Sequence, residues 1–142
     1  MNKVFEYVIY VFLALAIFTV GYIEYLTFFD ANPPIKFYSI EAKISDDGLY
    51  VLTPAEGYRY TDVAATVDIS FVNGIIYSLP SERYTGVGKG YFNNTRIHMI
   101  PPDMPNGVYH LYGISTYKIN PFATRIVEWD TNEFVINRTK GD

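Results

Sequence analysis

The chain has 142 residues, a formal net charge of −4 and no cysteine. An acidic chain without a run of Lys or Arg is not a nucleic-acid binder, because such proteins bring clustered cations to the phosphates. The lack of cysteine excludes disulfides, thiolate catalysis and cysteine-ligated metal sites.

An apolar run without any charged side chain, YVIYVFLALAIFTVGYI, occupies residues 7–23. Glu6 and Glu24 lie at its edges, where a carboxylate reaches the headgroup region, so the apolar segment extends over residues 4–26. At about 1.5 Å per residue, a helix of this length crosses a bilayer. Tyrosines flank both ends, as in the aromatic belts of membrane proteins. We predict a transmembrane helix at residues 4–26 that lies in the lipid bilayer.

A cleaved secretory signal is the alternative interpretation of this run. Residues 14–16 (Ala-Leu-Ala) have the small-x-small form of a cleavage site, but the apolar character continues beyond them, where a mature N-terminus usually becomes polar. We therefore favour an uncleaved signal-anchor. Lys3 precedes the run, whereas Glu24 and Asp30 follow it before the next cation. The positive-inside tendency then predicts a cytoplasmic N-terminus and a periplasmic or extracellular C-terminal domain.

A short stalk is predicted at residues 27–35, between the helix and the first strand. Two consecutive prolines, Pro33 and Pro34, follow Asp30 and Asn32 in this stretch. Each proline lacks an N–H group and disfavours helical backbone at the residue before it, so the helix ends here. Residues 36–142 then provide enough chain for one folded domain.

The domain is predicted to be all-β. Tyr, Phe, Val and Ile dominate it, and its apolar residues recur at every second position. In the first segment, Tyr38 and Ile40 are expected to face inward and Phe37 outward. Turn residues separate the segments at roughly ten-residue spacing, which is typical of an antiparallel sandwich or barrel. The predicted strands cover residues 35–44, 49–53, 64–72, 75–79, 95–100, 107–119, 124–129 and 133–136.

A β-hairpin is predicted where Asn73-Gly74 separates the strands at residues 64–72 and 75–79. Asn-Gly is the preferred pair for a type I′ turn, because both central residues of that turn need a positive φ. Within residues 64–72 the alternation places Ala65, Val67, Ile69 and Phe71 on one face, which we assign to the core.

The segment PPDMPNGVYHLYG contains Pro105-x-Gly107-x-Tyr109 and then alternating apolar residues. It resembles the turn into strand F of immunoglobulin-like β-sandwiches. The closing TNEFVI segment resembles the final strand of such domains. The resemblance implies an Ig-like antiparallel β-sandwich of the bacterial or viral type over residues 36–142. It also implies that Tyr109 is the corner tyrosine, whose hydroxyl bonds back to nearby backbone. The chain departs from the pattern because it has no cysteine pair, and its only tryptophan, Trp129, lies near the last strand.

No catalytic signature, metal site or cofactor site is predicted. The glycine-rich residues 85–91 lack the Ser or Thr that follows the lysine of a phosphate-binding loop. His98 and His110 have no third metal ligand, so we expect surface or structural histidines. Asp46-Asp47 precedes Gly48 and reads as a turn. We expect a non-enzymatic protein with no cofactor.

Aromatic residues around a cation suggest a binding patch. Tyr58, Arg59 and Tyr60 are assigned to one loop, and Tyr84 and Tyr91 to another. Tyr and Arg carry much of the binding energy at interfaces, so the sequence predicts a protein partner or self-association, with no small-molecule ligand.

We interpret the chain as a membrane-anchored extracytoplasmic interaction or structural module of bacterial or phage type. Two alternatives stay open. One is a phage membrane protein for envelope assembly or host lysis, and the other is a secreted carbohydrate-binding domain released by cleavage at Ala16.

Overall fold

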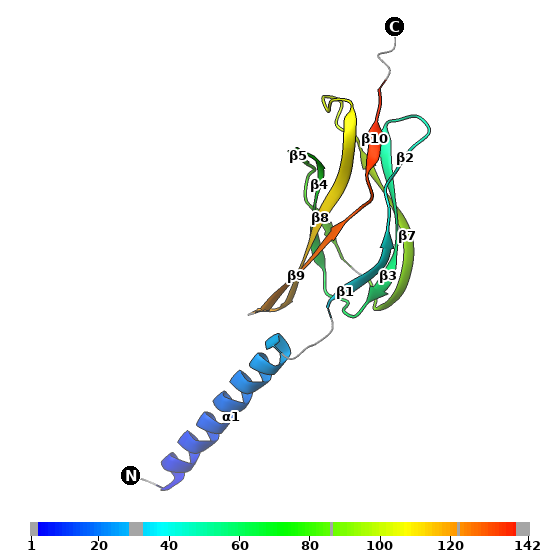
Figure 1. Cartoon of the computed structure of the whole chain (residues 1–142). Coiled ribbons are helices and arrows are strands. Elements are labelled where there is room, and N and C mark those ends of the chain that lie inside the picture. Colours follow the sequence, from blue (N-terminus) through cyan, green and yellow to red (C-terminus); the bar gives the residue numbers. More distant parts are fainter. Residues whose placement is uncertain (1–2, 29–32, 86, 122, 139–142) are drawn as a thin grey trace. The chain divides into compact units, whose positions relative to one another are not determined.

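The structure is a computed structural model that describes residues 3–28, 33–85, 87–121 and 123–138. The chain separates into two units, Met1–Asn32 and Pro33–Asp142 (Figure 1). The first unit contains one helix and the second contains the strands. Residues 29–32 of the predicted stalk lie outside the described residues.

Helix α1 (Lys3–Phe28) is apolar, and no side chain is buried in the most apolar part of its segment Lys3–Tyr25. The helix satisfies its own backbone hydrogen bonds, and Thr19 Oγ1 also donates to the Leu15 carbonyl at 2.7 Å. Its length and composition are therefore sufficient to cross a membrane. A signal sequence near an N-terminus has the same two properties.

The first sheet of the second unit is built around β3 (Tyr50–Arg59). Strand β7 (Gly90–Met99) pairs with the whole of β3 on one side. On the other side β1 (Ile35–Ile40) pairs with the end of β3, and β2 (Lys43–Ile44) pairs with its beginning. All these pairs are antiparallel.

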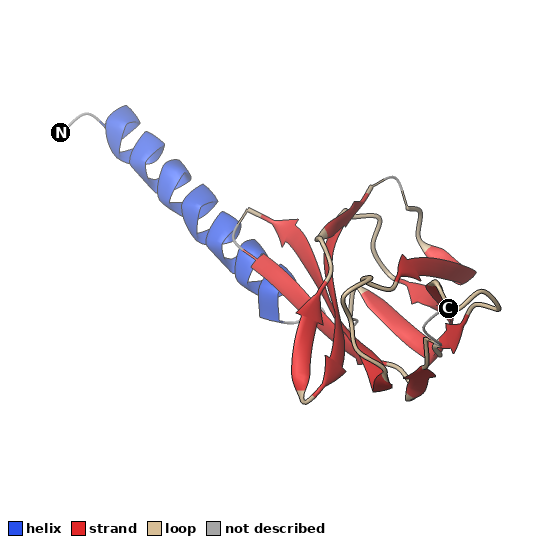
Figure 2. Cartoon of the chain, turned by 90° about the horizontal axis from the view of Figure 1, so that it is seen from above, coloured by secondary structure: helices blue, strands red, loops and turns tan. Residues whose placement is uncertain are grey.

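The second sheet is built around the longest strand, β8 (Gly107–Asn120), and lies across from the first (Figure 2). Strand β4 (Ala65–Asn73) pairs with one side of β8, and β9 (Ala123–Asp130) and β10 (Phe134–Ile136) pair with the other. Two short strands pair with β4, namely β5 (Ile75–Ser78) and β6 (Glu82–Tyr84). The mostly antiparallel β prediction is confirmed.

The inward faces of the two sheets share one hydrophobic core. On β4 the alternation predicted from the sequence is confirmed, because Ala65, Val67, Ile69 and Phe71 are all buried. Strand β8 contributes every second residue from Tyr109 to Tyr117. Both strands are therefore held by apolar burial on one face only, as expected for antiparallel sheets.

Three aromatic rings connect the sheets. The Phe37 ring centroid lies 5.8 Å from that of Phe92 in the first sheet and 6.2 Å from that of Trp129 in the second. Each of these two rings lies over a glycine on the neighbouring strand, with Gly57 opposite Phe92 and Gly113 opposite Trp129. Trp129 Nε1 also donates to Ser115 Oγ at 3.2 Å.

The predicted strand at residues 35–44 is broken in the structure. A bulge between Phe37 and Ser39 shifts the register against β3, and β1 ends at Ile40 before β2 begins. The bulge changes which residues face inward, so Phe37 packs against the core while Tyr38 is 54% exposed. The predicted orientation of these two side chains is wrong, because strict alternation cannot anticipate an extra residue.

The hairpin between β4 and β5 is confirmed, but its turn is not type I′. Asn73 pairs with Ile75, and Gly74 has a φ of 65°. No non-glycine residue has a positive φ within the described part of the chain, so Asn73 does not adopt the conformation that a type I′ turn needs. Gly107 lies close by, since a Cβ placed there would meet Asn73 Nδ2 at 2.7 Å.

Two contacts fix the chain around the entry to β8. The Tyr109 hydroxyl donates to the Pro105 carbonyl at 2.9 Å, which is the bond that the corner resemblance implies. The Arg138 guanidinium donates to the carbonyls of Ile100, Pro101 and Pro102 at 2.7–3.1 Å. Arg138 thereby ties the segment after β10 to the connection between β7 and β8.

We expect Gly113→Ala to destabilise the fold by about 1–3 kcal/mol, the usual cost of overpacking. A Cβ at this position would lie 2.0 Å from a Trp129 ring carbon, so the indole must leave its place beside Phe37. Gly88→Ala is the matched control, because no atom lies within 4 Å of its added Cβ. Urea unfolding of the full chain in detergent measures both, and equal midpoints would contradict the packing described here.

Candidate functional site

The residues of the predicted binding patch do not share one surface, because side chains along β3 point alternately outward and toward the other sheet. Tyr58 and Arg59 are the last two residues of this strand, so the loop predicted for them is wrong. Tyr58 faces outward and is 36% exposed, whereas Arg59 faces the space between the sheets. The strand continues past Pro54 because this proline falls between the part of β3 that pairs with β1 and the part that pairs with β2. It continues past Gly57 because the Phe92 ring occupies the space that a side chain would need.

Four tyrosines, three of them exposed and Tyr60 half-buried, form a group on the outer side of the first sheet. Tyr58 pairs in register with Tyr91 on β7, and its ring centroid lies 4.8 Å from that of Tyr60. Tyr38 on β1 is also exposed, and the Lys36 ammonium lies 5.9 Å from its ring centroid. We name this group the tyrosine face, comprising Tyr38, Tyr58, Tyr60 and Tyr91.

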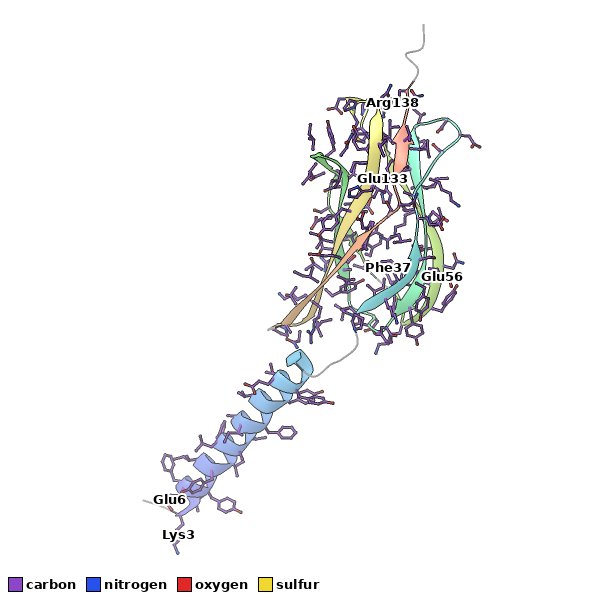
Figure 3. The ribbon with its side chains drawn as sticks, in the orientation of Figure 1. Lys3, Glu6, Phe37, Glu56, Glu133 and Arg138 are labelled. Atoms are coloured by element: carbon purple, nitrogen blue, oxygen red, sulfur yellow. The ribbon has the colours of Figure 1, made fainter. Side chains whose placement is uncertain are left out.

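The same outer surface continues along β3 and β7 beyond the tyrosine face. Glu56 and Asn93 form the next register pair, and Glu56 is labelled in Figure 3. A hydrogen bond to the Glu56 carboxylate raises the pKa of Tyr91. Further along, Ile97 and Met99 are 63% and 62% exposed. The outer surface is thus aromatic at one end, polar in the middle and aliphatic at the other end.

The outer surface of the second sheet differs in its chemistry. Thr66 pairs with Thr116 across β4 and β8, and Asp68 and Ser70 follow on the same side of β4. Tyr112 is the tyrosine of β8 on this side. Hydroxyl and carboxylate groups dominate the centre of this surface, so the two outer faces of the unit are not equivalent.

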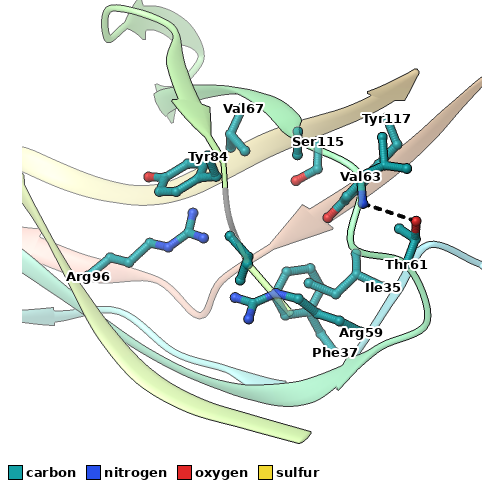
Figure 4. Close-up of a pocket in the computed structure, with 12 residues that line it drawn as sticks. Ile35, Phe37, Arg59, Thr61, Val63, Val67, Tyr84, Arg96, Ser115 and Tyr117 are labelled. Atoms are coloured by element: carbon teal, nitrogen blue, oxygen red, sulfur yellow. Dashed lines mark hydrogen bonds between the residues drawn. The ribbon is translucent and has the colours of Figure 1, made fainter. Parts of the chain in front are cut away.

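Arg59 and Tyr84, the other two residues of the predicted patch, line a cavity between the sheets together with Arg96 (Figure 4). The cavity has about 420 Å³ of empty space, including its opening to solvent. The Arg59 guanidinium lies 4.5 Å from the Phe92 ring centroid, and that of Arg96 lies 3.9 Å from the ring centroid of Tyr84. Both cations therefore rest on aromatic rings.

Neither Arg59 nor Arg96 forms an ion pair with a carboxylate among the described residues. The cations in the ion pairs Lys43–Glu41 and His110–Asp130 lie outside the cavity. Burial, and then the charge of Arg96, lowers the pKa of Arg59. The two guanidinium groups are therefore close enough to repel each other.

Tyr84 connects the cavity to a carboxylate at its edge. Its hydroxyl donates to Glu82, and burial, reinforced by this bond, raises the pKa of Tyr84 to about 12. Glu82 is itself exposed. The sequence analysis did not assign Arg96 to this cluster, because its place near Arg59 depends on the pairing of β7 with β3, two strands that are distant in the sequence. The alternation of β7 places Phe92, Arg96 and His98 inward.

His98 is buried, so of the two expected roles, surface or structural, it has the structural one. It is 3% exposed, and its Nε2 lies 3.1 Å from Thr53 Oγ1. His110 lies on β8 and approaches Asp130 at 3.7 Å. Among the described residues, no group of three or more His, Asp or Glu could hold a metal ion.

The other local motifs have structural roles. In the turn at residues 45–49, Asp47 accepts hydrogen bonds from the Ser45 hydroxyl and the Leu49 N–H group, and Gly48 has a φ of 70°. The bond from Ser45 is the main cause that lowers the pKa of Asp47. The glycine-rich residues 85–91 lead into β7, although Gly86 lies outside the described residues.

Comparison with models of known protein families gives no match, and comparison with curated proteins gives none. A fold by itself does not determine a function. The functional inference for this chain therefore starts from the tyrosine face and the arginine-lined cavity.

Acid should destabilise the β unit through His98. Its pKa is lowered below 6.5, mainly by burial, so the native state stays neutral while the unfolded chain takes up a proton. The contribution of neutral His98 to the free energy of unfolding is complete above pH 6.5. Below pH 6.5 the free energy of unfolding falls by up to about 1.4 kcal/mol per pH unit, until the pH passes the pKa of His98 in the native state.

Urea unfolding at pH 7, 6 and 5 measures this dependence. His98→Gln removes the titration and keeps a hydrogen-bonding side chain, so its stability should fall less than that of the wild type. His110→Gln is the matched control for loss of a histidine. Parallel pH profiles for the wild type and His98→Gln would show that another group causes the acid sensitivity.

Proposed function

We propose that the chain is a single-pass membrane protein whose β unit binds a protein partner through the tyrosine face. The observation that supports this function best is the exposure of Tyr38 and Tyr91, which are 54% and 59% accessible beside Tyr58. Tyrosine presents a large apolar ring and a hydrogen-bonding hydroxyl at low entropic cost, which is why interfaces are enriched in it. The chain is proposed to act by binding and not by catalysis.

The partner is proposed to be a protein because the exposed apolar residues are spread over three adjacent strands. Protein interfaces combine aromatic and aliphatic contacts with a polar surround. The register of β3 and β7 gives this composition, with Tyr58 opposite Tyr91, Glu56 opposite Asn93 and Leu52 opposite Ile97. A second copy of the chain and a different protein both satisfy these requirements.

An immunoglobulin-like sandwich is the proposed fold. Its strands A, B, E and D form one sheet and its strands C, F and G form the other. In the first sheet β1 pairs with β3 and β3 pairs with β7, and in the second β4 pairs with β8 and β8 pairs with β9, which supports the orders A-B-E and C-F-G. The bond from Tyr109 to Pro105 supports it further. The chain departs from the common pattern at β6, which pairs with β4 instead of β7.

Helix α1 is proposed to remain as an anchor, with the N-terminus in the cytoplasm and the β unit outside. Lys3 lies at the start of the helix, and Glu6 and Glu24 lie near its two ends, outside its central apolar part. The single cation before the apolar segment supports this orientation. An extracytoplasmic position suits a unit whose proposed binding surface must be open to a partner.

Photo-cross-linking in native membranes tests the tyrosine face. A photoreactive residue at Asn93 should yield an adduct, because Asn93 lies next to the tyrosines on the outer surface. The same residue at Thr116, on the outer surface of the second sheet, should yield much less. The adduct mass distinguishes a second copy of the chain from a different protein.

Tyr38→Ser combined with Tyr91→Ser should reduce the Asn93 adduct at least tenfold. Both side chains are more than half exposed, so each change should alter stability by no more than about 0.5 kcal/mol. Tyr112→Ser is the matched control on the other sheet and should leave the adduct unchanged. Equal adducts from Asn93 and Thr116, or an adduct insensitive to the tyrosines, would refute this binding surface.

Protease added to intact cells that express the chain tests the anchor and its orientation. The β unit should be degraded, while a fragment containing α1 should be protected by the membrane. A protected β unit would reverse the proposed orientation. An intact mass that lacks residues 1–16 would show that the helix is a cleaved signal.

A further inference from the structure

The cavity between the sheets contains hydrogen-bond donors that the binding function does not use. Arg59 and Arg96 carry only donors, and both guanidinium groups enter the cavity (Figure 4). The Thr61 hydroxyl accepts from the Val63 N–H group at 3.2 Å, and the Ser115 hydroxyl accepts from Trp129 Nε1 at 3.2 Å. Each of these hydroxyls therefore keeps its proton for donation.

The guanidinium groups of Arg59 and Arg96 would both be stabilised by an anion. Two guanidinium groups face one small space, and within the described residues no carboxylate forms an ion pair with either of them. Their stacking on Phe92 and Tyr84 holds the planar groups in place without neutralising them. An anion between them would replace repulsion by charge-assisted hydrogen bonds.

We propose that Arg59 and Arg96 bind a phosphate group in this cavity. Arginine forks match the oxygens of phosphate, and the polar side chains of Thr61 and Ser115 line the same cavity. The space enclosed by the lining residues is small and opens to solvent. The cavity therefore takes only a phosphate group, and the rest of any larger molecule would lie in the opening. This departs from the sequence-based expectation of no small ligand.

The phosphate has two available sources. One is free inorganic phosphate, which needs no further assumption. The other is the headgroup of an anionic lipid, and this source rests on the proposed membrane anchor.

Thermal unfolding of the full chain in lipid nanodiscs tests the site, with the fluorescence of Trp129 as the signal. Trp129 is the only tryptophan and its indole is bonded to Ser115 of the cavity. In phosphatidylcholine discs, sodium phosphate is compared with sodium chloride at equal ionic strength. At ten times the dissociation constant the wild type should gain about 5 °C in Tm.

Phosphate also stabilises proteins without binding a site, so the variants decide the outcome. Arg59→Gln and Arg96→Gln should each lose the gain. Arg83→Gln removes an equal charge from an exposed position of β6 and should keep it. Arg59→Lys keeps the charge but not the fork, and its gain should be smaller than that of the wild type. If Arg96→Gln does not fold, the comparison of Arg59→Lys with the wild type tests the site.

A second set of discs separates the two sources. Phosphatidylglycerol replaces phosphatidylcholine, and no phosphate is added. A wild-type gain in Tm with inorganic phosphate identifies a soluble ligand, and a gain only with phosphatidylglycerol identifies a lipid headgroup. In either case the gain must be absent in Arg59→Gln. If the wild type responds like Arg59→Gln in both sets of discs, the phosphate site does not exist.

Discussion

The contact of Phe37 with Phe92 and Trp129 is the interaction on which the β unit depends. Phe37 belongs to a short strand with a bulge, yet its ring is the one that touches an aromatic ring of each sheet. Gly57 and Gly113 make this possible, because each leaves room for one of the two larger rings. Phe37 also lines the cavity between the sheets, so the same ring belongs to the core and to the cavity wall.

The alternation of side chains along β3 and β7 separates two chemistries on one sheet. The outward residues give the tyrosine face, and the inward residues of the same strands give the arginines of the cavity. Neighbouring residues such as Tyr58 and Arg59 thus point to opposite faces of the sheet. A change in the register of this sheet by one residue would place the cations in solvent and the tyrosines between the sheets.

Much of the fold was predictable because β4 alternates apolar and polar residues without interruption and the predicted strands are separated by turn residues. The errors lie where one residue alters the pattern. The bulge after Phe37 reverses the expected inward face, and Asn73 keeps a negative φ next to Gly74. A glycine such as Gly57 favours the end of a strand in a sequence-based prediction. In the structure the strand continues, because the Phe92 ring occupies the space that a side chain at position 57 would need. The cluster of Arg59 with Arg96 could not be predicted, since it depends on the pairing of two strands that are distant in the sequence.

Arg138 has a consequence for the order in which the chain becomes folded. It follows all the strands of the β unit in chain order, and it fixes three carbonyls between β7 and β8, while β10 just before it completes one edge of the second sheet. These contacts cannot form until every strand of the β unit has been synthesised. An N-terminal portion of the unit that ends before β10 therefore lacks both this edge and the three bonds that hold the connection between β7 and β8. Folding of the unit is then completed by its C-terminal segment, after the central strands of both sheets are available to pair.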